Sequence, residues 1–537
     1  MSNLITVCIA VVLYFSCSAS PGRADQPPEG DWVGALNLKG TMEVANVHFK
    51  NEEGGVHASL DFPVRQQMDL ALSRVMIEAG KIHFEWEDQS GPVIFDGQLS
   101  GNTISGTTRQ GEARGSFELV RTVKIDAATY AEYGGLYEIT PGKLVAIGAF
   151  PGDPQYVDFE SGRTGSLFAL SESTLFAGPA YQIPAPIDIR ITFVRGENQE
   201  VTGLVWQQSG SPEKLARKIK FRREDLTFRN GDVTLSGTLV LPNTAGPHPA
   251  VVRIHGAGPA TRLNFIDEYN AYHGIAFFSY DKRGAGKSTG DWREAGVEEL
   301  AGDALAAVQT LKARKDINAK QVGVAGGSEG GWVAPLVAAR DRSVAFIITI
   351  SGPALSFSEE VLYEIEDGLR ANGLSEDEVK RALAFRRRIS ELTRSGDALT
   401  DEGWAKVEAA TREVRNEKWF PFISPWPKGF WRWKKFHMMS KFDPQPLWEK
   451  TTIPVLAFYG ERDRNVPATR NAAALEQYLR KAGNKDFTVI TLPKANHYGM
   501  EAERGFLDGE LSRLTRTAPG FLDGPLKWTL KHVDVKK

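Results

Sequence analysis

Hydrophobic and polar residues alternate over short stretches in the N-terminal part of the chain. In Lys81–Trp86 and Ile189–Phe193, apolar side chains recur at every second position. Turn residues separate such stretches at intervals of about 8 to 12 residues, which is typical of antiparallel all-β structure. We therefore predict two β-rich modules, a barrel- or sandwich-like one at residues 25–125 and a second at residues 126–222.

The pattern changes at about residue 225, where longer apolar runs begin to alternate with stretches of helical spacing such as Gly296–Lys312. The runs that we predict to be strands are Ala250–Ile254, Ile275–Tyr280, Val322–Ala325, Ala345–Ile350, Pro454–Tyr459 and Phe487–Leu492. Near-continuous apolar strands separated by helices indicate a parallel sheet covered on both faces. Residues 223–537 are therefore predicted to form an α/β domain with a mostly parallel sheet.

One insertion interrupts this alternation. Residues 355–446 contain charged helical stretches and then a run rich in Trp and Pro. Because they lie between two predicted strands of the sheet, we predict that they form a helical cap over the strand ends.

Composition narrows the possible partners. The 537 residues carry 64 basic and 67 acidic side chains, so the net charge is −3. The sequence therefore has no excess of basic residues of the kind that binds nucleic acid. Both cysteines, Cys8 and Cys17, lie in or beside an apolar run, Leu4–Phe15, that small residues follow up to Ala24. This pattern predicts a signal peptide at residues 1–24 and export to the periplasm or the medium, with no membrane attachment after cleavage.

Two alternatives to cleavage remain open at this end of the chain: a retained membrane anchor, and lipid attachment at Cys17, although Tyr14–Ser16 fits a lipobox poorly. If the signal is removed, the mature chain has no cysteine, which excludes disulfides, a thiolate nucleophile and Cys-ligated metals. No later apolar run approaches the roughly 18 residues that a membrane-spanning helix needs.

The segment Gly326–Gly331 reads Gly-Gly-Ser-Glu-Gly-Gly and follows a predicted strand. A Gly-x-Ser-x-Gly between a strand and a helix is a nucleophile elbow, in which a tight, strained turn lifts the serine hydroxyl above the sheet. Taken alone, the pattern would also fit a Gly-rich turn with an incidental serine. Ser328 is the candidate nucleophile.

A serine hydroxyl needs a positioned base that is itself oriented by an acid, and behind a nucleophile elbow these follow in the order acid, then histidine. Asp463 comes just after the strand Pro454–Tyr459, and His497 just after the strand Phe487–Leu492. Both fall at strand C-terminal ends, where active sites of open α/β sheets gather. We predict a catalytic triad of Ser328, Asp463 and His497, with Glu461 as the rival acid.

Acyl transfer also needs backbone N–H groups that already point at the developing oxyanion. The loop His255–Pro259, His-Gly-Ala-Gly-Pro, directly follows a predicted strand. We predict an oxyanion hole formed by this loop at Gly256 and Ala257 and by the amide of Glu329. His255 precedes the predicted base in the wrong chain order and is interpreted as structural.

The segment Asp281–Ser288, Asp-Lys-Arg-Gly-Ala-Gly-Lys-Ser, looks like a phosphate-binding loop. That motif requires Gly at the position that Asp281 occupies, so we interpret the segment as a structural turn. The sequence contains no His-Glu-x-x-His pattern, and no metal or cofactor is predicted.

Together these segments resemble the α/β-hydrolase superfamily over roughly residues 225–515. The Gly pair after Ser328-Glu329 is similar to prolyl-oligopeptidase-like members, and the Asp281–Gly284 turn is similar to bacterial esterases and serine-aminopeptidase-like hydrolases. Such proteins often have Arg-Asp where this chain has Thr261–Asn264. The β modules loosely resemble accessory domains of bacterial secreted hydrolases. The resemblance implies acyl-enzyme chemistry on a carboxylic ester, without cofactor or metal.

The cap supplies the candidate substrate contacts. Its tryptophans could line an apolar pocket or could pack the cap, and those that we name as candidates are Trp404, Trp419, Trp426, Trp431 and Trp433. Its acidic start, from Glu359 to Asp367, could bind a substrate ammonium or form a solvated face. The sequence does not predict an oligomeric state.

Three hypotheses follow for function. The first is an esterase acting on a small-molecule ester. The second is a serine peptidase, aminopeptidase or thioesterase with the same triad, in the peptidase case cleaving a short peptide. The third is an inactive surface binding protein, against which the complete triad argues.

Overall fold

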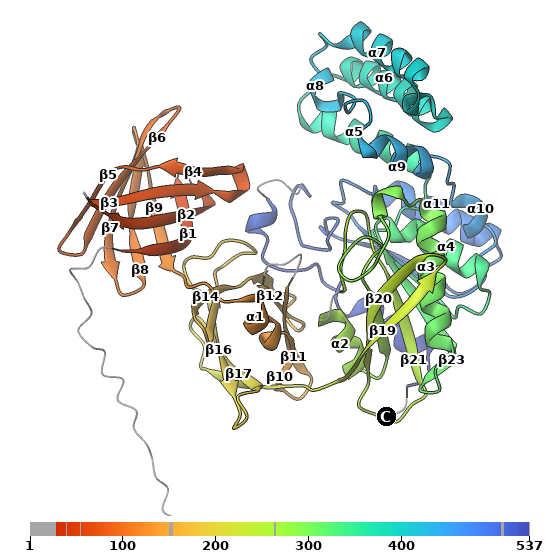
Figure 1. Ribbon diagram of the computed structural model, residues 1–537, viewed down its shortest axis with the longest axis horizontal. Coiled ribbons are helices and arrows are strands. Elements are labelled where there is room, and N and C mark those ends of the chain that lie inside the picture. Colours follow the sequence, from red (N-terminus) through yellow and green to blue (C-terminus); the bar gives the residue numbers. More distant parts are fainter. Residues whose placement is uncertain are drawn as a thin grey trace, which may run out of the picture. The chain divides into compact units, whose positions relative to one another are not determined.

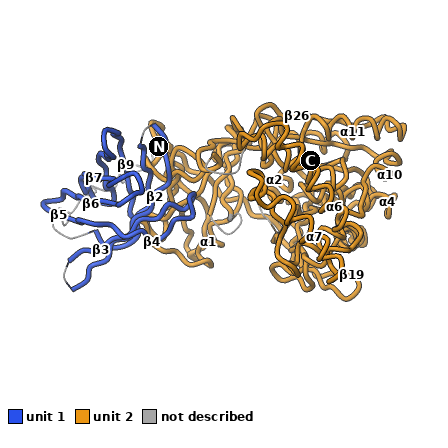
Figure 2. Tube along the Cα trace, turned by 90° about the horizontal axis from the view of Figure 1, so that it is seen from above, with its two compact units in different colours: residues 1–121 blue, residues 122–537 orange. Residues whose placement is uncertain are grey.

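The computed structural model describes residues 28–38, 40–53, 55–149, 154–262, 265–505 and 510–535. The predicted signal peptide lies outside them. The chain divides into two compact units, residues 1–121 and 122–537, coloured separately in Figure 2.

The first unit is a single antiparallel sheet in the order β4-β3-β2-β1-β9-β8-β7-β6-β5. Its strands are β1 Gly30–Leu38, β2 Thr41–Glu52, β3 Gly55–Phe62, β4 Gln67–Ala71, β5 Ser73–Glu78, β6 Lys81–Asp88, β7 Gly91–Ser100, β8 Thr103–Gln110 and β9 Ala113–Arg121. The short 3-10 helix Pro63–Arg65 precedes β4. One residue, Leu72, connects the edge strands β4 and β5, so the sheet curls round a core that contains Trp32, Phe49 and Phe84.

The second unit begins with another antiparallel sheet, in the order β13-β12-β11-β10-β18-β17-β16-β15-β14. Its strands are β10 Gly135–Thr140, β11 Lys143–Ala149, β12 Pro154–Asp158, β13 Thr164–Ser166, β14 Phe168–Ser171, β15 Thr174–Ala177, β16 Ile189–Arg195, β17 Val201–Gln208 and β18 Lys214–Lys218. Helix α1, Ala127–Tyr133, precedes them, and the Asp126 carboxylate caps it by accepting from two of its amides. Both predicted β modules are therefore antiparallel sheets.

The third sheet has the order β19-β20-β22-β21-β23-β24-β25-β26 and is parallel from β22 to β26. Its strands are β19 Arg222–Asn230, β20 Val233–Leu241, β21 His248–Ile254, β22 Ala276–Tyr280, β23 Ile317–Gly327, β24 Ile347–Ile350, β25 Val455–Gly460 and β26 Phe487–Leu492. The α/β prediction is confirmed. The antiparallel hairpin β19–β20 was not among the predicted strands, because β19 is largely exposed and its apolar residues are limited to Leu226 and Phe228.

Two apolar layers cover this sheet. One face packs against α3 Val297–Lys312, α4 Gly330–Arg340 and α11 Ala468–Lys481. The other packs against α2 Phe265–Tyr272, α12 Gly524–His532 and the neighbouring β module. Burial on both faces explains why these strands are almost continuously apolar in sequence.

The cap is helical, as predicted, and is seen at the top of Figure 1. Its helices are α5 Phe357–Ala371, α6 Glu376–Ser395, α7 Asp401–Val414, α8 Phe420–Ile423 and α9 Trp431–Met439, and α10 Gln445–Trp448 follows. The 3-10 helices are Trp292–Glu294 before α3, Asp397–Leu399 in the cap and Leu511–Arg513 near the end of the chain. The cap has a hydrophobic core of its own around Ile389, Trp419 and Trp433.

Candidate active site

Ser328 lies in the turn between β23 and α4, in a strained backbone conformation. Its φ of 49° is in the left-handed region, which a residue with a side chain rarely adopts. A Cβ on Gly326 would lie 2.2 Å from the Gly330 carbonyl oxygen, and one on Gly330 would lie 2.7 Å from the Ile254 oxygen. The turn is therefore possible only with glycine at these two positions.

The structure brings Ser328, His497 and Asp463 together from three separate loops. The Ser328 Oγ lies 3.1 Å from His497 Nε2, and the Asp463 Oδ2 lies 2.8 Å from His497 Nδ1. Asp463 is buried, and its Oδ1 accepts from the amides of Asn465 and Val466 at 2.9 Å each. The three side chains form one hydrogen-bonded chain that ends at the serine hydroxyl.

The rival acid Glu461 does not contact the histidine. It is exposed, and its Oε2 accepts from the backbone amide of Lys494 at 2.8 Å, in the turn that leads to His497. A residue that sequence reasoning missed supports this loop from the other side: Ser351, after β24, donates to the His497 carbonyl oxygen at 3.1 Å. No local motif marks Ser351, so the sequence held no signal for it.

The loop after β21 lies against the serine. A Cβ on Gly256 would lie 3.2 Å from the Ser328 Cβ. The Lys282 ammonium donates to the Gly256 carbonyl oxygen at 2.7 Å, and because this peptide is trans, the Ala257 N–H points the opposite way. The amides of Ala257 and Glu329 have no hydrogen-bond acceptor among the described residues.

His255 is buried at the tip of β21, and its Nε2 donates to the Tyr280 carbonyl oxygen. Burial lowers its pKa to about 3. The side chain is therefore neutral and packs as a structural residue, as its place in the chain order predicts.

The side chain of Glu329 joins a buried ionic network that sequence reasoning also missed. Its carboxylate accepts from Lys282 at 2.5 Å and from Lys435 of cap helix α9 at 3.0 Å. Burial raises the pKa of Glu329, but the two lysine charges outweigh it and hold that pKa below its ordinary value. Lys435 also donates to the Ala295 carbonyl oxygen at 2.6 Å. The network ties the cap to the residue that follows Ser328.

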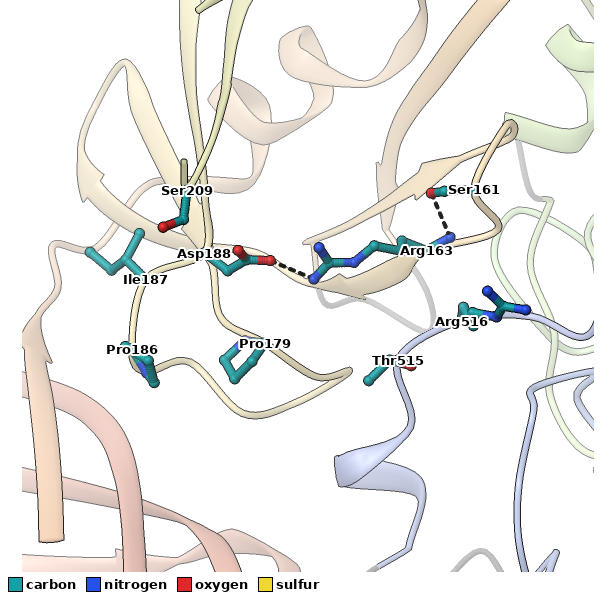
Figure 3. A pocket seen from close by; sticks show the side chains of 9 residues that line it. All are labelled: Ser161, Arg163, Pro179, Pro186, Ile187, Asp188, Ser209, Thr515 and Arg516. Atoms are coloured by element: carbon teal, nitrogen blue, oxygen red, sulfur yellow. Dashed lines mark hydrogen bonds and ion pairs between the residues drawn. The ribbon is translucent and has the colours of Figure 1, made fainter. Parts of the chain in front are cut away.

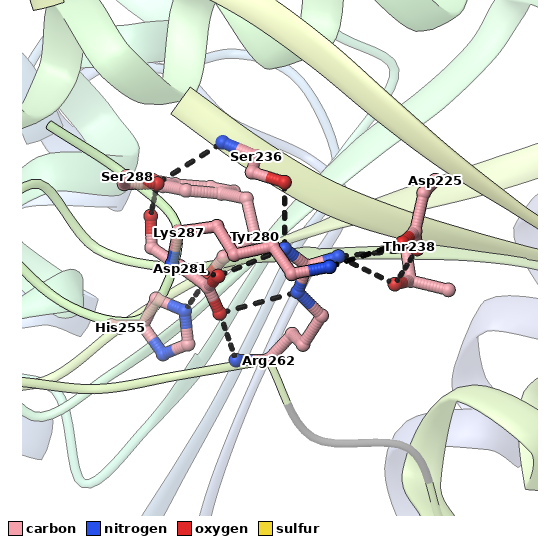
Figure 4. Close-up of polar contacts among 9 residues, drawn as sticks. All are labelled: Asp225, Ser236, Thr238, His255, Arg262, Tyr280, Asp281, Lys287 and Ser288. Carbon is pink, nitrogen blue, oxygen red and sulfur yellow. Dashed lines mark hydrogen bonds and ion pairs between the residues drawn. The ribbon is translucent and has the colours of Figure 1, made fainter. Parts of the chain in front are cut away.

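The Asp281–Ser288 segment forms a tight turn around the Asp281 carboxylate, shown in Figure 4. Arg262 donates to that carboxylate from its backbone amide at 3.0 Å and from its guanidinium at 2.8 Å. A Cβ on Gly286 would lie 2.5 Å from the Asp281 carboxyl carbon. The Asp281 carboxylate and the Arg262 groups that bind it hold this turn together. The segment is therefore a structural turn, as we interpret it from the sequence.

The acidic start of the cap has two different environments. Glu360 and Asp367 lie on one face of α5: Glu360 accepts from the Asn471 amide at 2.8 Å, and Asp367 pairs with Arg464 at 2.5 Å. Glu364 lies on this same face between them and has no hydrogen bond or ion pair among the described residues.

The candidate tryptophans lie mainly in the core of the cap. Trp419 and Trp433 are fully buried there, and Trp404 and Trp426 pack against that core. Trp431 contacts Trp292 outside the cap, with ring centroids 5.0 Å apart. These positions describe packing contacts, so a role in lining a substrate pocket stays a hypothesis.

A pocket of about 540 Å³ lies elsewhere, between the second β module and the segment before α12 (Figure 3). Arg163 and Asp188 form an ion pair on its wall at 2.6 Å. None of the candidate catalytic residues lines it.

Among the described residues, no group of His, Cys, Asp and Glu could hold a metal ion. In the same part of the chain, no helix is long and apolar enough to cross a membrane.

Comparison with known proteins relates this part of the chain to a family and to a curated relative. Residues 251–508 match the model of the "Alpha/beta hydrolase family", a range that holds Ser328, Asp463 and His497. Esterase EstD of Thermotoga maritima is 24% identical over 383 residues, which cover 67% of this chain and 84% of EstD.

Part of the chain is also similar to solved structures. Est1E of Butyrivibrio proteoclasticus with bound ferulic acid has a TM-score of 0.35 at 18% identity, covering 57% of this chain and 96% of its own. Acetyl xylan esterase 1 of a Thermoanaerobacterium species has a TM-score of 0.34 at 15% identity, covering 64% and 88%.

Proposed function

Because residues 251–508 form an alpha/beta-hydrolase domain, we propose that this protein is a serine hydrolase that cleaves carboxylic esters through an acyl-enzyme intermediate. The observation that carries the proposal is the continuous hydrogen-bonded chain from Asp463 through His497 to the Ser328 hydroxyl. The similarity to an esterase over 84% of that relative's length supports the ester as the bond cleaved.

The reaction proceeds in two halves. As the Ser328 oxygen attacks the ester carbonyl carbon, His497 Nε2 takes the hydroxyl proton, and it then gives this proton to the departing alcohol. Water, deprotonated by the same nitrogen, attacks the acyl-serine ester and releases the acid. Asp463 fixes the tautomer of His497 and stabilises its protonated form, which its 2.8 Å hydrogen bond to Nδ1 favours.

The oxyanion of each tetrahedral intermediate is bound by the amides of Ala257 and Glu329. Both amides lack an acceptor among the described residues, and Gly256 holds the first of them beside Ser328. Preorganised donors of this kind account for a large share of catalysis in acyl transfer, about 3 to 4 kcal/mol per donor.

Labelling and substitution test the proposal directly. We expect a fluorophosphonate to label the native protein at Ser328, and Ser328→Ala to abolish both labelling and turnover of aryl esters while the fold is retained. A protein that resists labelling and turns over no acyl substrate would be a binding protein instead. Aminoacyl anilides assayed beside the aryl esters separate a peptidase from an esterase.

The acid is tested by a matched pair. Asp463→Ala should reduce kcat/KM by about three to four orders of magnitude, as loss of the orienting acid does elsewhere. Glu461→Ala removes only a contact to the Lys494 amide, so it should do far less damage. Equal losses for the two variants would remove Asp463 from its role.

We further propose that the protein is exported, with the signal predicted at residues 1–24 removed. The apolar run Leu4–Phe15 and the restriction of cysteine to Cys8 and Cys17 support this proposal. N-terminal sequencing of the protein from its native host would decide it: an N-terminus near residue 25 is expected, and an intact Met1 would refute cleavage.

A further inference from the structure

Arg386, on helix α6, is buried inside the cap, where the charge of Glu364 on α5 is the one that favours its ionised form. Its side chain is only 8% exposed, and its Nε is fully enclosed without an acceptor. No hydrogen bond or ion pair of the guanidinium occurs among the described residues; its contact is with the face of Trp426, 5.9 Å from the ring centroid. A buried charge without an acceptor costs several kcal/mol, and a ligand that supplies an acceptor would offset this cost.

A second unpaired arginine lies on the same tryptophan. The guanidinium of Arg432, on α9, is 5.4 Å from the Trp426 ring, and this side chain also has no ion pair among the described residues. Two guanidinium groups therefore lie on one ring. Arginine suits such a site, because its planar fork matches a carboxylate with two parallel hydrogen bonds.

A continuous series of aromatic contacts connects this site to the nucleophile. Trp426 meets Phe436 at 4.8 Å between ring centroids, and Phe436 meets Phe357 at 4.7 Å. Phe357 in turn meets Trp332 at 5.7 Å, and Trp332 lies on α4, one helical turn after Ser328. The arginines and the serine are therefore at two ends of one aromatic wall.

Glu364 is within electrostatic range of both the arginines and the histidine. Its side chain is exposed, and partial burial of the carboxyl group raises its pKa. Arg386 and Arg432 lower the same pKa in part by their positive charge, whereas the charge of Asp463 raises it. A substrate carboxylate at the arginines would therefore need direct hydrogen bonds to a guanidinium to outweigh repulsion from Glu364.

We propose that Arg386, assisted by Arg432, binds a carboxylate of the substrate, so that the preferred substrates are esters whose acyl part ends in a free carboxylate. This inference rests on the proposed ester hydrolysis and names its substrate class. The aromatic wall accommodates the apolar chain between the two ends of the substrate. In this arrangement the carboxylate lies at the arginines and the ester carbonyl at Ser328.

The test compares matched pairs of substrates. The 4-nitrophenyl half esters of linear dicarboxylic acids, from succinate to suberate, are assayed beside 4-nitrophenyl esters of neutral acids of equal length. Arg386→Met should reduce kcat/KM by about tenfold or more for the best half ester and by less than about threefold for its neutral counterpart. Arg432→Met, whose side chain is exposed, should show the same selectivity to a smaller degree without endangering the fold.

Arg387 provides the matched control, since it follows Arg386 on α6 and is exposed. Arg387→Met should leave both rates unchanged. If Arg386→Met and Arg432→Met alter neither substrate, or reduce the half ester and the neutral ester equally, the site is structural and the proposal is overturned.

A binding measurement separates this proposal from the proposed function. Calorimetric titration of the Ser328→Ala protein with monomethyl adipate should show binding that Arg386→Met weakens about tenfold or more. If the native protein hydrolyses no ester but this binding is seen, the esterase proposal fails and the carboxylate site stands. If neutral esters are hydrolysed but monomethyl adipate does not bind, the esterase stands and the carboxylate site is refuted.

Discussion

At the scale of single residues, two adjacent glycines before the serine have different roles. A Cβ on Gly326 would meet the Gly330 oxygen at 2.2 Å, whereas a Cβ on Gly327 would have only the Ile350 oxygen near it, at 3.8 Å. The distance for Gly326 is far shorter than a van der Waals contact, whereas the distance for Gly327 is an ordinary van der Waals contact. The strict requirement in this turn is therefore for Gly326 and Gly330 and does not extend to Gly327.

We accordingly expect Gly326→Ala to displace Ser328 and reduce kcat/KM by about two orders of magnitude or more, because a shift of about 1 Å at a reacting atom has effects of that size. Gly327→Ala should retain activity within a few-fold. Steady-state assays of the two variants, with circular dichroism to verify folding, make the comparison. Equal activity of both variants would contradict the described turn.

At the scale of secondary-structure elements, one lysine of helix α9 connects the cap to the turn that holds Ser328. Lys435 and Glu329 are both buried, and removing one partner of a buried charge pair costs about 3 to 5 kcal/mol. Its neighbour Lys434 pairs with Glu294 in an exposed position, where a pair contributes about 0 to 1 kcal/mol. The two adjacent lysines thus differ in environment while sharing charge and size.

Lys435→Met should therefore lower the temperature of the calorimetric transition of the catalytic unit by several degrees and reduce kcat/KM, since the backbone beside Ser328 loses a support. Lys434→Met should change neither quantity measurably. A Lys435→Met protein with native stability and native kcat/KM would show that Lys282 alone suffices for Glu329.

Helix α5 carries a buried carboxyl that makes its packing depend on pH. Burial raises the pKa of Glu360 from 4.5 to about 8, and its Oε2 is buried without a partner among the described residues. Between these two pKa values the folded chain holds a proton that the unfolded chain has lost. Stability from this group is thus complete below pH 4.5 and falls as pH rises toward 8.

Glu360→Gln keeps an oxygen acceptor for the Asn471 amide and removes the titration. We expect this variant to unfold at a higher temperature than the native protein at about pH 9 and at a similar temperature at about pH 5, as proton linkage requires. Thermal unfolding over this pH range measures the difference. A variant that loses stability equally at both ends would show that Glu360 is ionised in the fold.

Some of these elements could be predicted from the sequence, and others could not. The strands around the active site are buried on both faces, so they stand out as apolar runs, and a strained serine turn leaves a glycine signature. No local sequence pattern marks Lys282, Lys435 or Ser351, because the partners of each lie far away in the chain. The hairpin β19–β20 lies at the sheet edge, where partial exposure weakens the apolar pattern.

At the scale of the whole molecule, the two β modules have the same strand order. Each sheet begins and ends with consecutive strands joined by one leucine, Leu72 in the first and Leu167 in the second. The sequence pattern predicted two modules of similar style but not this shared topology, which depends on which strands pair. The shared order is consistent with a repeated structural unit within one chain.

The two modules nevertheless differ in how they relate to the sheet of the hydrolase domain. The second module shares a hydrophobic core with it: Leu136 and Leu144 pack in one cluster with Phe277. Phe159 stacks on Tyr269 at 3.9 Å between ring centroids. The first module forms the separate unit that ends at Arg121.

This difference makes truncation informative. A chain that begins at Thr122 keeps every core cluster of the catalytic unit, so it should fold and hydrolyse esters with kcat/KM within a few-fold of the full chain. A chain that begins at Arg222 loses the second module and exposes Phe277, Tyr269 and their neighbours. Since each large apolar side chain returned to water costs about 1.5 to 3 kcal/mol and a whole protein has only about 5 to 15 kcal/mol of stability, this shorter chain should aggregate or unfold.

Size-exclusion chromatography, thermal unfolding and ester hydrolysis of the two truncated proteins test both expectations. A soluble and active chain from Arg222 would mean that the second module is dispensable to the hydrolase core, and an inactive chain from Thr122 would mean that catalysis depends on the first module in a way that the core clusters do not reveal.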